Sequence, residues 1–325
     1  MLPAFLAPVF LLAASLAPPL PASAGIFPPS AFSDKAAGAT SAVFLKTPVG
    51  ARGPALGCSA AAAVDGAESL FWNPAGLSRM ASSGLSELAA GYNALLETSY
   101  TGAFAYARPL SDHRGTFGAS LVYFSQSAIQ GYTPRGDPSA PFTPNDVALS
   151  GAYARTFGSV HAGGALKVVR SELAGESGST FALDFGVQAE RLTDISEGAL
   201  DLGAAVQNLG PALKLGSVSD PLPFKVTGGA VWHINPSVIG LLDIHAPVDA
   251  DPYASLGMEF GTAFGEGMKA ALRGGYNIKQ ERAIDGLTGL SGGFGVDLLK
   301  FRLDYAWVPL GELGTTHRVS LAFRF

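Results

Sequence analysis

Cysteine is nearly absent from this chain, since Cys58 is the single cysteine among 325 residues. One cysteine excludes an intramolecular disulfide and any metal site built from several cysteines. Charge is also scarce, because Asp, Glu, Lys and Arg make up 14% of the residues and leave a net charge of −5. No basic block is present that could follow a phosphate backbone, so nucleic acid is not an expected partner.

Long apolar runs are the third absence. Beyond residue 24, no apolar run reaches the roughly 18 residues that a membrane helix needs. The mean hydropathy is nevertheless positive and the chain contains 41 glycines, which is not typical of a soluble enzyme. Any membrane crossing must therefore be made by strands.

Residues 1–24 have the pattern of a secretory signal peptide. An apolar stretch and a proline-rich break precede Ala22-Ser23-Ala24, and this small-x-small ending predicts cleavage before Gly25. The chain then divides into a signal peptide (1–24), an N-terminal lead-in and plug segment (25–83) and a barrel (84–325). Short helices and turns are expected from Lys46 to Met80, where Ala and Gly dominate.

From about Leu85 onward, apolar and polar residues alternate with the period of two that marks strands. In 317–325, HRVSLAFRF, the apolar residues share one face and Arg or small residues the other. About fourteen such segments of roughly 9 to 13 residues predict an all-β fold: a transmembrane antiparallel β-barrel with an N-terminal plug, or hatch, in its lumen. Their approximate centres are Ala89, Phe104, Leu121, Gly151, Ala165, Phe185, Ala204, Gly228, Leu242, Met258, Arg273, Phe294, Asp304 and Leu321.

The connections between these segments alternate in length, as the periplasmic turns and external loops of such a barrel do. With the C-terminus in the periplasm, the largest external loop is Gln126–Asn145. This loop is either a contact for a partner or a solvated, tolerant insertion. The short links are Phe157–Val160, Ile234–Val238, Phe264–Met268 and Leu299–Lys300; the long ones are Gln126–Asn145, Ser171–Ser179, Leu209–Leu222, Ala246–Pro252 and Lys279–Gly289; Pro109–Gly115 and Leu192–Gly198 are intermediate.

No catalytic constellation is found, and no cofactor or metal is expected. The five histidines are scattered without metal-ligand spacing, and the glycine-rich stretches lack the helix and lysine of a phosphate loop. Charged residues of both signs fall on the inward face of the strands, which predicts either a hydrated lumen with charges paired across strands and against the plug, or a selectivity ring. The lumen candidates are Asp184, Lys225, Arg273, Arg302, Asp304 and Arg318.

The segment Val49–Met80 resembles the N-terminal signature of the PorV/PorQ family of outer-membrane proteins, which are similar to FadL-type fatty acid transporters. Gly50-Ala51-Arg52, Ala55-Leu56-Gly57 and Asp65 match this signature. It departs from the usual pattern at Pro54 and at Cys58-Ser59. The plug motif that ends the match is Trp72, Asn73, Pro74, Ala75, Gly76 and Leu77.

Two further segments resemble the same family, around Gln207-Asn208-Leu209-Gly210-Pro211 and at the C-terminal hairpin. The resemblance covers nearly all of the mature chain and implies a bacterial outer-membrane location. Outer-membrane lipid and the barrel-assembly machinery are then the expected partners. The aromatic residues Phe323 and Phe325 would form the assembly signal.

Three functions are compatible with this sequence, and none is an enzyme. The leading hypothesis is a PorV-like barrel that binds or shuttles exported proteins in a type IX-like secretion pathway. The alternatives are a FadL-like uptake channel for hydrophobic small molecules and a structural outer-membrane protein whose plug never moves. The partner would be secreted proteins in the first case and a hydrophobic ligand in the second.

Overall fold

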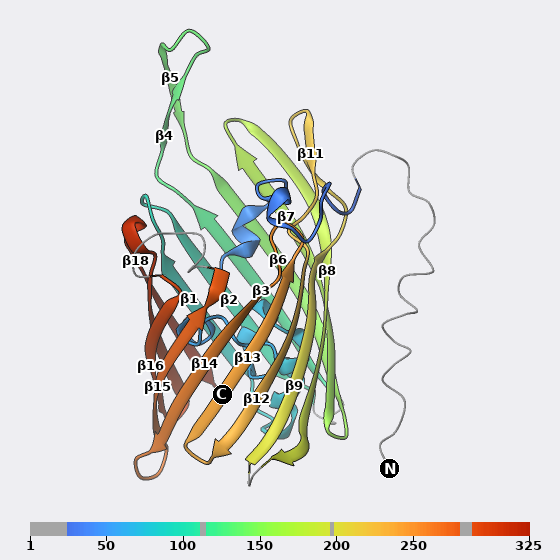
Figure 1. Cartoon of the computed structure of the whole chain (residues 1–325), viewed down its shortest axis with the longest axis vertical. Helices are drawn as coiled ribbons and strands as arrows, with labels where there is room; N and C mark the ends of the chain where they lie inside the picture. The colour runs from blue at the N-terminus through green and yellow to red at the C-terminus, as the bar shows by residue number, and fades with distance from the viewer. Residues whose placement is uncertain (1–24, 111–114, 196–197, 280–287) are drawn as a thin grey trace.

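A closed antiparallel β-barrel forms the body of the molecule in the computed structural model (Figure 1). The structure describes residues 25–110, 115–195, 198–279 and 288–325. The predicted signal peptide and parts of the links Pro109–Gly115, Leu192–Gly198 and Lys279–Gly289 lie outside these residues. The barrel strands are β1 (Glu87–Ala94), β2 (Tyr100–Pro109), β3 (Thr116–Ser125), β6 (Asn145–Phe157), β7 (Val160–Leu173), β8 (Glu176–Ile195), β9 (Gly198–Leu209), β12 (Lys225–Asn235), β13 (Val238–Pro247), β14 (Tyr253–Ala263), β15 (Met268–Asn277), β16 (Leu290–Leu298), β17 (Phe301–Pro309) and β18 (Thr315–Arg324).

The fourteen barrel strands confirm the predicted fold class, and every predicted strand centre falls inside one of them. Consecutive barrel strands are neighbours, and β1 pairs with β18, with Leu88 opposite Phe323, so the sheet closes on itself. A closed sheet pairs its strand edges internally, which satisfies the backbone within an apolar layer.

Side chains divide between the two faces of the wall as the alternation predicts. Along β18, Val319 and Leu321 are exposed on the outside while Arg318 and Ser320 are buried on the inside. Other outward residues include Phe104 and Leu272, each more than 60% exposed. Large apolar side chains thus face outward all around the wall, as a lipid environment requires.

Most of the long connections lie at one end of the barrel and the short turns lie at the other, where the C-terminus also lies (Figure 1). The prediction of a long link at Ser171–Ser179 is wrong, because β7 and β8 extend through this segment and leave only Ala174 and Gly175 as a turn. Two long links contain structure that the sequence did not predict. The link Gln126–Asn145 forms a hairpin of β4 (Ile129–Tyr132) and β5 (Pro138–Phe142), which projects beyond the rim. The link Leu209–Leu222 forms a second hairpin of β10 (Leu213–Leu215) and β11 (Val218–Asp220).

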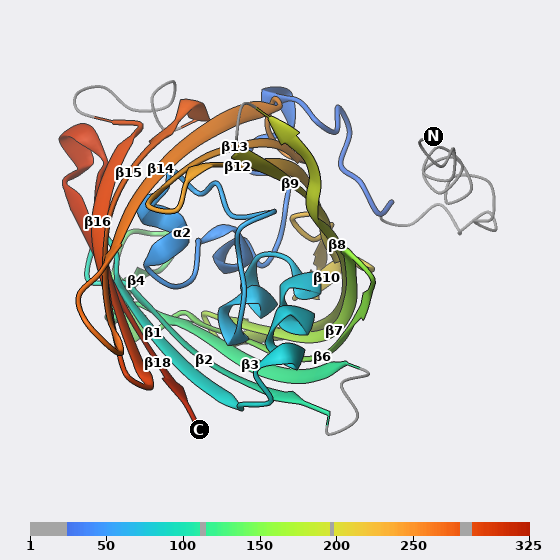
Figure 2. The same cartoon turned by 90° about the horizontal axis from the view of Figure 1, so that it is seen from below.

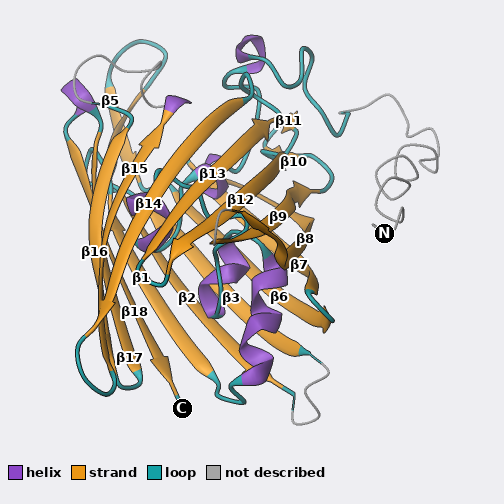
Figure 3. Cartoon of the chain, turned by 60° about the horizontal axis from the view of Figure 1, so that its bottom comes forward, coloured by secondary structure: helices purple, strands orange, loops and turns teal. Residues whose placement is uncertain are grey.

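The N-terminal segment enters the lumen and occupies much of it, as seen along the barrel in Figure 2 and obliquely from the short-turn end in Figure 3. This segment, here called the plug, consists of short helices and turns, as expected from its composition. Among the residues that the structure describes, no helix is long and apolar enough to cross a membrane. The helices are η1 (Asp34–Ala36), η2 (Val43–Lys46), α2 (Arg52–Ala55), η3 (Ala67–Phe71) and η4 (Pro74–Ser82), with η5 (Gly311–Leu313) outside the plug.

The plug motif begins helix η4 and fastens it to the wall. The side chain of Asn73 accepts a hydrogen bond from the backbone of Ala75 (3.1 Å), which caps the helix, and Pro74 takes the first helical position. The amide of Asn73 also donates to the carbonyls of Ala61 (2.7 Å), Val187 and Ala204 (both 3.2 Å). One buried amide therefore joins two plug segments to strands β8 and β9.

Candidate functional site

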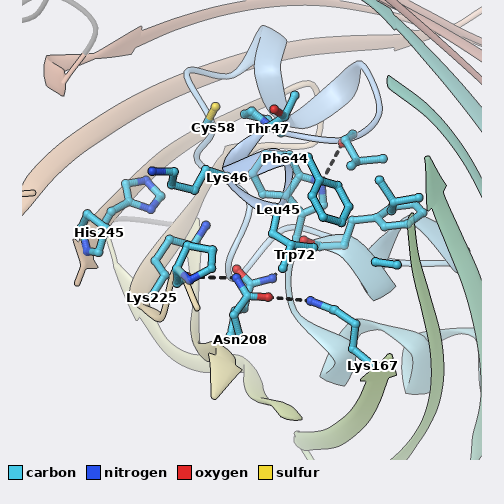
Figure 4. A pocket seen from close by; sticks show the side chains of 18 of the residues that line it. Phe44, Leu45, Lys46, Thr47, Cys58, Trp72, Lys167, Asn208, Lys225 and His245 are labelled. Atoms are coloured by element: carbon cyan, nitrogen blue, oxygen red, sulfur yellow. Dashed lines mark hydrogen bonds between the residues drawn. The ribbon is translucent and has the colours of Figure 1, made fainter. Parts of the chain in front are cut away.

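A cavity lies at the long-loop end of the lumen, between the plug and the wall (Figure 4). We call it the outer cavity, and it contains about 1000 Å³ of empty space, part of it open to solvent. The plug contributes apolar and aromatic side chains, namely Phe44, Leu45, Phe71 and Trp72. In Figure 4, the wall residues His245, Lys225, Asn208 and Lys167 form an arc around these plug side chains.

The rim of the outer cavity is held by a polar network. Asp249, in the link between β13 and β14, accepts hydrogen bonds from Lys46 (2.7 Å) and Thr40 (2.9 Å). Partial burial acts to raise the pKa of Asp249, but Lys46 and Thr40 hold this pKa below its usual range. This network fixes helix η2, and with it Phe44, over the cavity.

A second cavity opens at the short-turn end, where it reaches the turn residues Pro236 and Ser237. We call it the inner vestibule, and its lining is charged with both signs. Arg273 binds Glu259 and Asp304, each at 2.5 Å, while Arg302 binds Asp297 at 2.7 Å. The pairs of Arg273 with Glu259 and of Arg302 with Asp297 join neighbouring strands, and the pair of Arg273 with Asp304 crosses over β16 at Gly295. Together they hold the wall from β14 to β17 on the lumen side.

The plug takes part in the same ion-pair network. Arg52 donates to both carboxylate oxygens of Glu259, at 3.1 and 3.2 Å, and Arg302 reaches Asp65 at 3.4 Å. Burial acts to raise the pKa of Asp65, but Arg302 and Arg52 hold it well below its usual range. Pairing of charges across strands and against the plug, the first of the two predicted arrangements, is thus present in the structure.

A small cavity within the plug lies between the outer cavity and the inner vestibule. It shares Trp72 with the former and Arg52 with the latter. The indole of Trp72 packs on Gly53 and donates a hydrogen bond to the carbonyl of Val49 at 3.1 Å. Glu68 also lines this small cavity, and burial, with Asp304 nearby, raises its pKa to about 7.

The six predicted lumen residues do face inward, but they do not form one site. Lys225 lines the outer cavity, whereas Arg273, Arg302 and Asp304 line the inner vestibule. Asp184 is buried in an ion pair with Lys167 (2.9 Å). Arg318 is 5% exposed and donates to the carbonyl of Pro48 (2.6 Å).

Several residues that shape the outer cavity were not selected from the sequence. Phe44 and Lys46 belong to the lead-in, Asp249 to a loop, and Lys279 to the last described turn after β15. Asn208 lies in a segment that was noted only for its family resemblance, and its backbone N–H binds Asp184 at 2.7 Å. These residues come together from segments that are far apart in the sequence. No local sequence pattern therefore marks them as parts of one site.

The assembly-signal residues lie on the outside of the barrel at the short-turn end. The ring of Phe323 stacks between those of Phe301 and Phe325, with centroids 4.7 and 5.5 Å apart. The backbone of Phe325 exchanges two hydrogen bonds of 2.9 Å with Ser86, which precedes β1. Their part in assembly stays a prediction.

The closed fourteen-stranded barrel with its inserted N-terminal plug is similar in fold to several solved structures. The barrel is similar to a mutant of the TodX monoaromatic hydrocarbon channel, with 12% sequence identity over 85% of this chain and 98% of that one and a TM-score of 0.57. It is also similar to the Ralstonia pickettii toluene transporter TbuX, with 14% sequence identity over 85% of this chain and 97% of that one and a TM-score of 0.54. A Pseudomonas aeruginosa FadL homologue is similar with 10% identity over 86% of this chain and 98% of that one and a TM-score of 0.53.

No protein-family model and no curated protein sequence matches the chain. At these identities, the structural likeness shows the fold alone, which is that of the TodX, TbuX and FadL-homologue barrels. TodX is a monoaromatic hydrocarbon channel and TbuX is a toluene transporter. The resemblance to PorV and PorQ stays a prediction from the sequence.

Proposed function

We propose that this protein is a channel for small hydrophobic molecules in a bacterial outer membrane. The observation that carries the proposal is the outer cavity, which places Phe44, Leu45, Phe71 and Trp72 inside a barrel of FadL type. A concave site with apolar walls and a few polar groups is the usual form of a small-molecule site. The short-turn end would face the periplasm and the long-loop end the exterior.

The plug would control passage, because it stands between the outer cavity and the inner vestibule. Its contacts with the wall are many and include the Arg52–Glu259 pair. Because this pair is largely buried, Arg52 would have to exchange partners within the same network of charges as the plug moves. Movement of the plug segment around Trp72 would therefore connect the two cavities.

The test is uptake of labelled toluene by cells that contain or lack this protein. We expect the initial uptake rate to fall several-fold in the deletion strain and to return with the wild-type gene. Unchanged uptake would exclude a channel for toluene and would favour a structural outer-membrane protein. Measuring the secreted and surface proteome of the same strains addresses the PorV-like hypothesis, which predicts a loss of exported proteins while toluene uptake stays constant.

A further inference from the structure

The outer cavity carries more positive than negative charge. Four lysines line it, Lys46, Lys167, Lys225 and Lys279, against the single carboxylate of Asp249. Lys46 is paired with Asp249 at 2.7 Å, and Lys167 with Asp184 at 2.9 Å. Among the residues that the structure describes, Lys225 and Lys279 have no carboxylate within 4.0 Å. Within the described part of the chain, neither of these two ammonium groups is therefore in direct contact with a carboxylate.

Lys225 occupies a central place in the wall of this cavity. It lies on β12 between Gln207 of β9 and Pro247 of β13, and all three line the cavity. Its ammonium has no hydrogen-bond acceptor among the described residues, whereas its neighbour His245 is hydrogen-bonded to Ser255 at 2.9 Å. Lys225 is partly buried, and the carboxylates of Asp243 and Asp184 act on its charge without direct contact. An anion in direct contact with the ammonium would therefore lower its free energy.

The space around these lysines is bounded by aromatic rings. Phe44, Phe71 and Trp72 come from the plug, and Tyr253 comes from the start of β14. The ammonium of Lys279 lies over the ring of Tyr253, 5.6 Å from its centroid. Aromatic rings that line a cavity favour an arene over an aliphatic group of equal size, because ring faces and edges attract one another.

We propose that the outer cavity binds small aromatic carboxylates and that Lys225 is its specificity-determining residue. The inference rests on the proposed channel function and names the class of molecule that the channel takes. The ring would lie against Phe44 and Trp72, while the carboxylate accepts a charge-assisted hydrogen bond from Lys225. A neutral arene of the same size would leave this ammonium without a partner.

Three matched probes separate the two halves of the proposal. Benzoate has both ring and charge, toluene has the ring alone, and cyclohexanecarboxylate has the charge without the arene. Labelled benzoate is equilibrated by dialysis with the purified full-length protein in detergent, with empty micelles as the blank, and the other two compete for it. We expect toluene to bind at least about tenfold more weakly than benzoate, and cyclohexanecarboxylate about threefold more weakly.

Substitutions at one position then test the assigned residue. Lys225→Met removes the charge and shortens the side chain by only one heavy atom, so benzoate affinity should fall at least about tenfold while toluene affinity is kept. Lys225→Arg should keep benzoate affinity within a few-fold. Lys214→Met is the control, because Lys214 is an exposed lysine of hairpin β10–β11 outside the cavity. Heat-modifiable gel mobility verifies that each variant is folded.

The outcomes distinguish this inference from the function on which it rests. If the wild-type protein binds toluene as tightly as benzoate, the anion preference is wrong, and the hydrophobic channel stands. If Lys225→Met binds benzoate like the wild type, the assignment of Lys225 is wrong. Equal affinity for cyclohexanecarboxylate overturns the aromatic requirement. Should Lys225→Met fail to fold, the wild-type probes and Lys225→Arg still decide the question. No binding of any probe, together with unchanged toluene uptake, defeats the channel itself.

Discussion

Gly186 of β8 faces the lumen where the plug presses on the wall. A Cβ atom added at this position would lie 1.8 Å from Oδ1 of Asn73. At Gly163 of the neighbouring strand β7, an added Cβ would lie 2.6 Å from the carbonyl of Pro74. Glycine is therefore required here for the approach of the plug backbone, rather than for strand curvature.

A single methyl group at this contact should loosen the plug. We expect Gly186→Ala to displace Asn73 and to weaken its buried hydrogen bonds, each worth about 1–3 kcal/mol when a buried partner is left unsatisfied. The measurement is hydrogen exchange of the amides in η3 and η4. Gly151→Ala on β6 is the matched control, because an added Cβ there meets nothing within 4 Å. Equal exchange in the two variants would mean that the contact does not hold the plug.

At the scale of elements, the plug fits the wall because side-chain sizes are complementary. Its large residues Leu70, Leu77 and Met80 are buried against alanines of the wall, among them Ala105 and Ala154. This packing is apolar and independent of pH. The half-buried Glu68 is different, because its carboxyl lies within the plug and burial raises its pKa to about 7.

The raised pKa of Glu68 predicts that the plug is less stable in base than in acid. The pKa of this carboxyl is about 7 in the folded state and about 4.5 when the carboxyl is exposed to water. The protonated carboxyl therefore contributes its full stability below pH 4.5, and this contribution is lost as the pH rises through 7. We expect hydrogen exchange in η3, corrected for intrinsic rates, to accelerate between pH 5 and pH 8. Glu68→Gln should remove this dependence, and the exposed Glu97→Gln should keep it. An unchanged pH dependence in Glu68→Gln would show that another group is responsible.

At the scale of the whole molecule, closure of the barrel depends on the pairing of its first and last strands. The backbone of Phe325 extends this seam through Ser86, and its side chain, 46% exposed, points outward. Its ring therefore adds little to the packed interior. A role for this ring in recognition by the assembly machinery can be separated from a role in stability.

Phe325→Ala should impair assembly in the cell without weakening the folded barrel. The backbone hydrogen bonds to Ser86 remain available to alanine, and the lost ring contact is on the surface. We expect a several-fold lower yield of the heat-modifiable form in the outer membrane, but unchanged refolding of the purified chain in detergent. Phe301→Ala is the matched control, since Phe301 is 51% exposed on the adjoining strand. Equal yields of the two variants in cells would contradict an assembly signal at Phe325.

The strands could be predicted from the sequence because lipid and a polar lumen impose opposite demands on alternate residues. This constraint acts along each strand separately, so all fourteen centres could be located. The hairpins β4–β5 and β10–β11 could not, because they project beyond the wall and carry little of that alternation. The plug segment was predicted from its composition and from the Asn73-Pro74 motif. This motif specifies a turn because Asn can bond local backbone groups and Pro fixes its φ angle.

The sequence by itself thus determined the barrel, the inward face of its strands and the presence of a plug, because each follows from neighbouring residues along the chain. Only the tertiary structure decided which charges are neutralised. Lys167 has Asp184 beside it and Arg52 has Glu259, whereas Lys225 has no carboxylate in contact among the residues that the structure describes. Pairing depends on register between strands and on the path of the plug, both of which are set by contacts between residues far apart in the sequence.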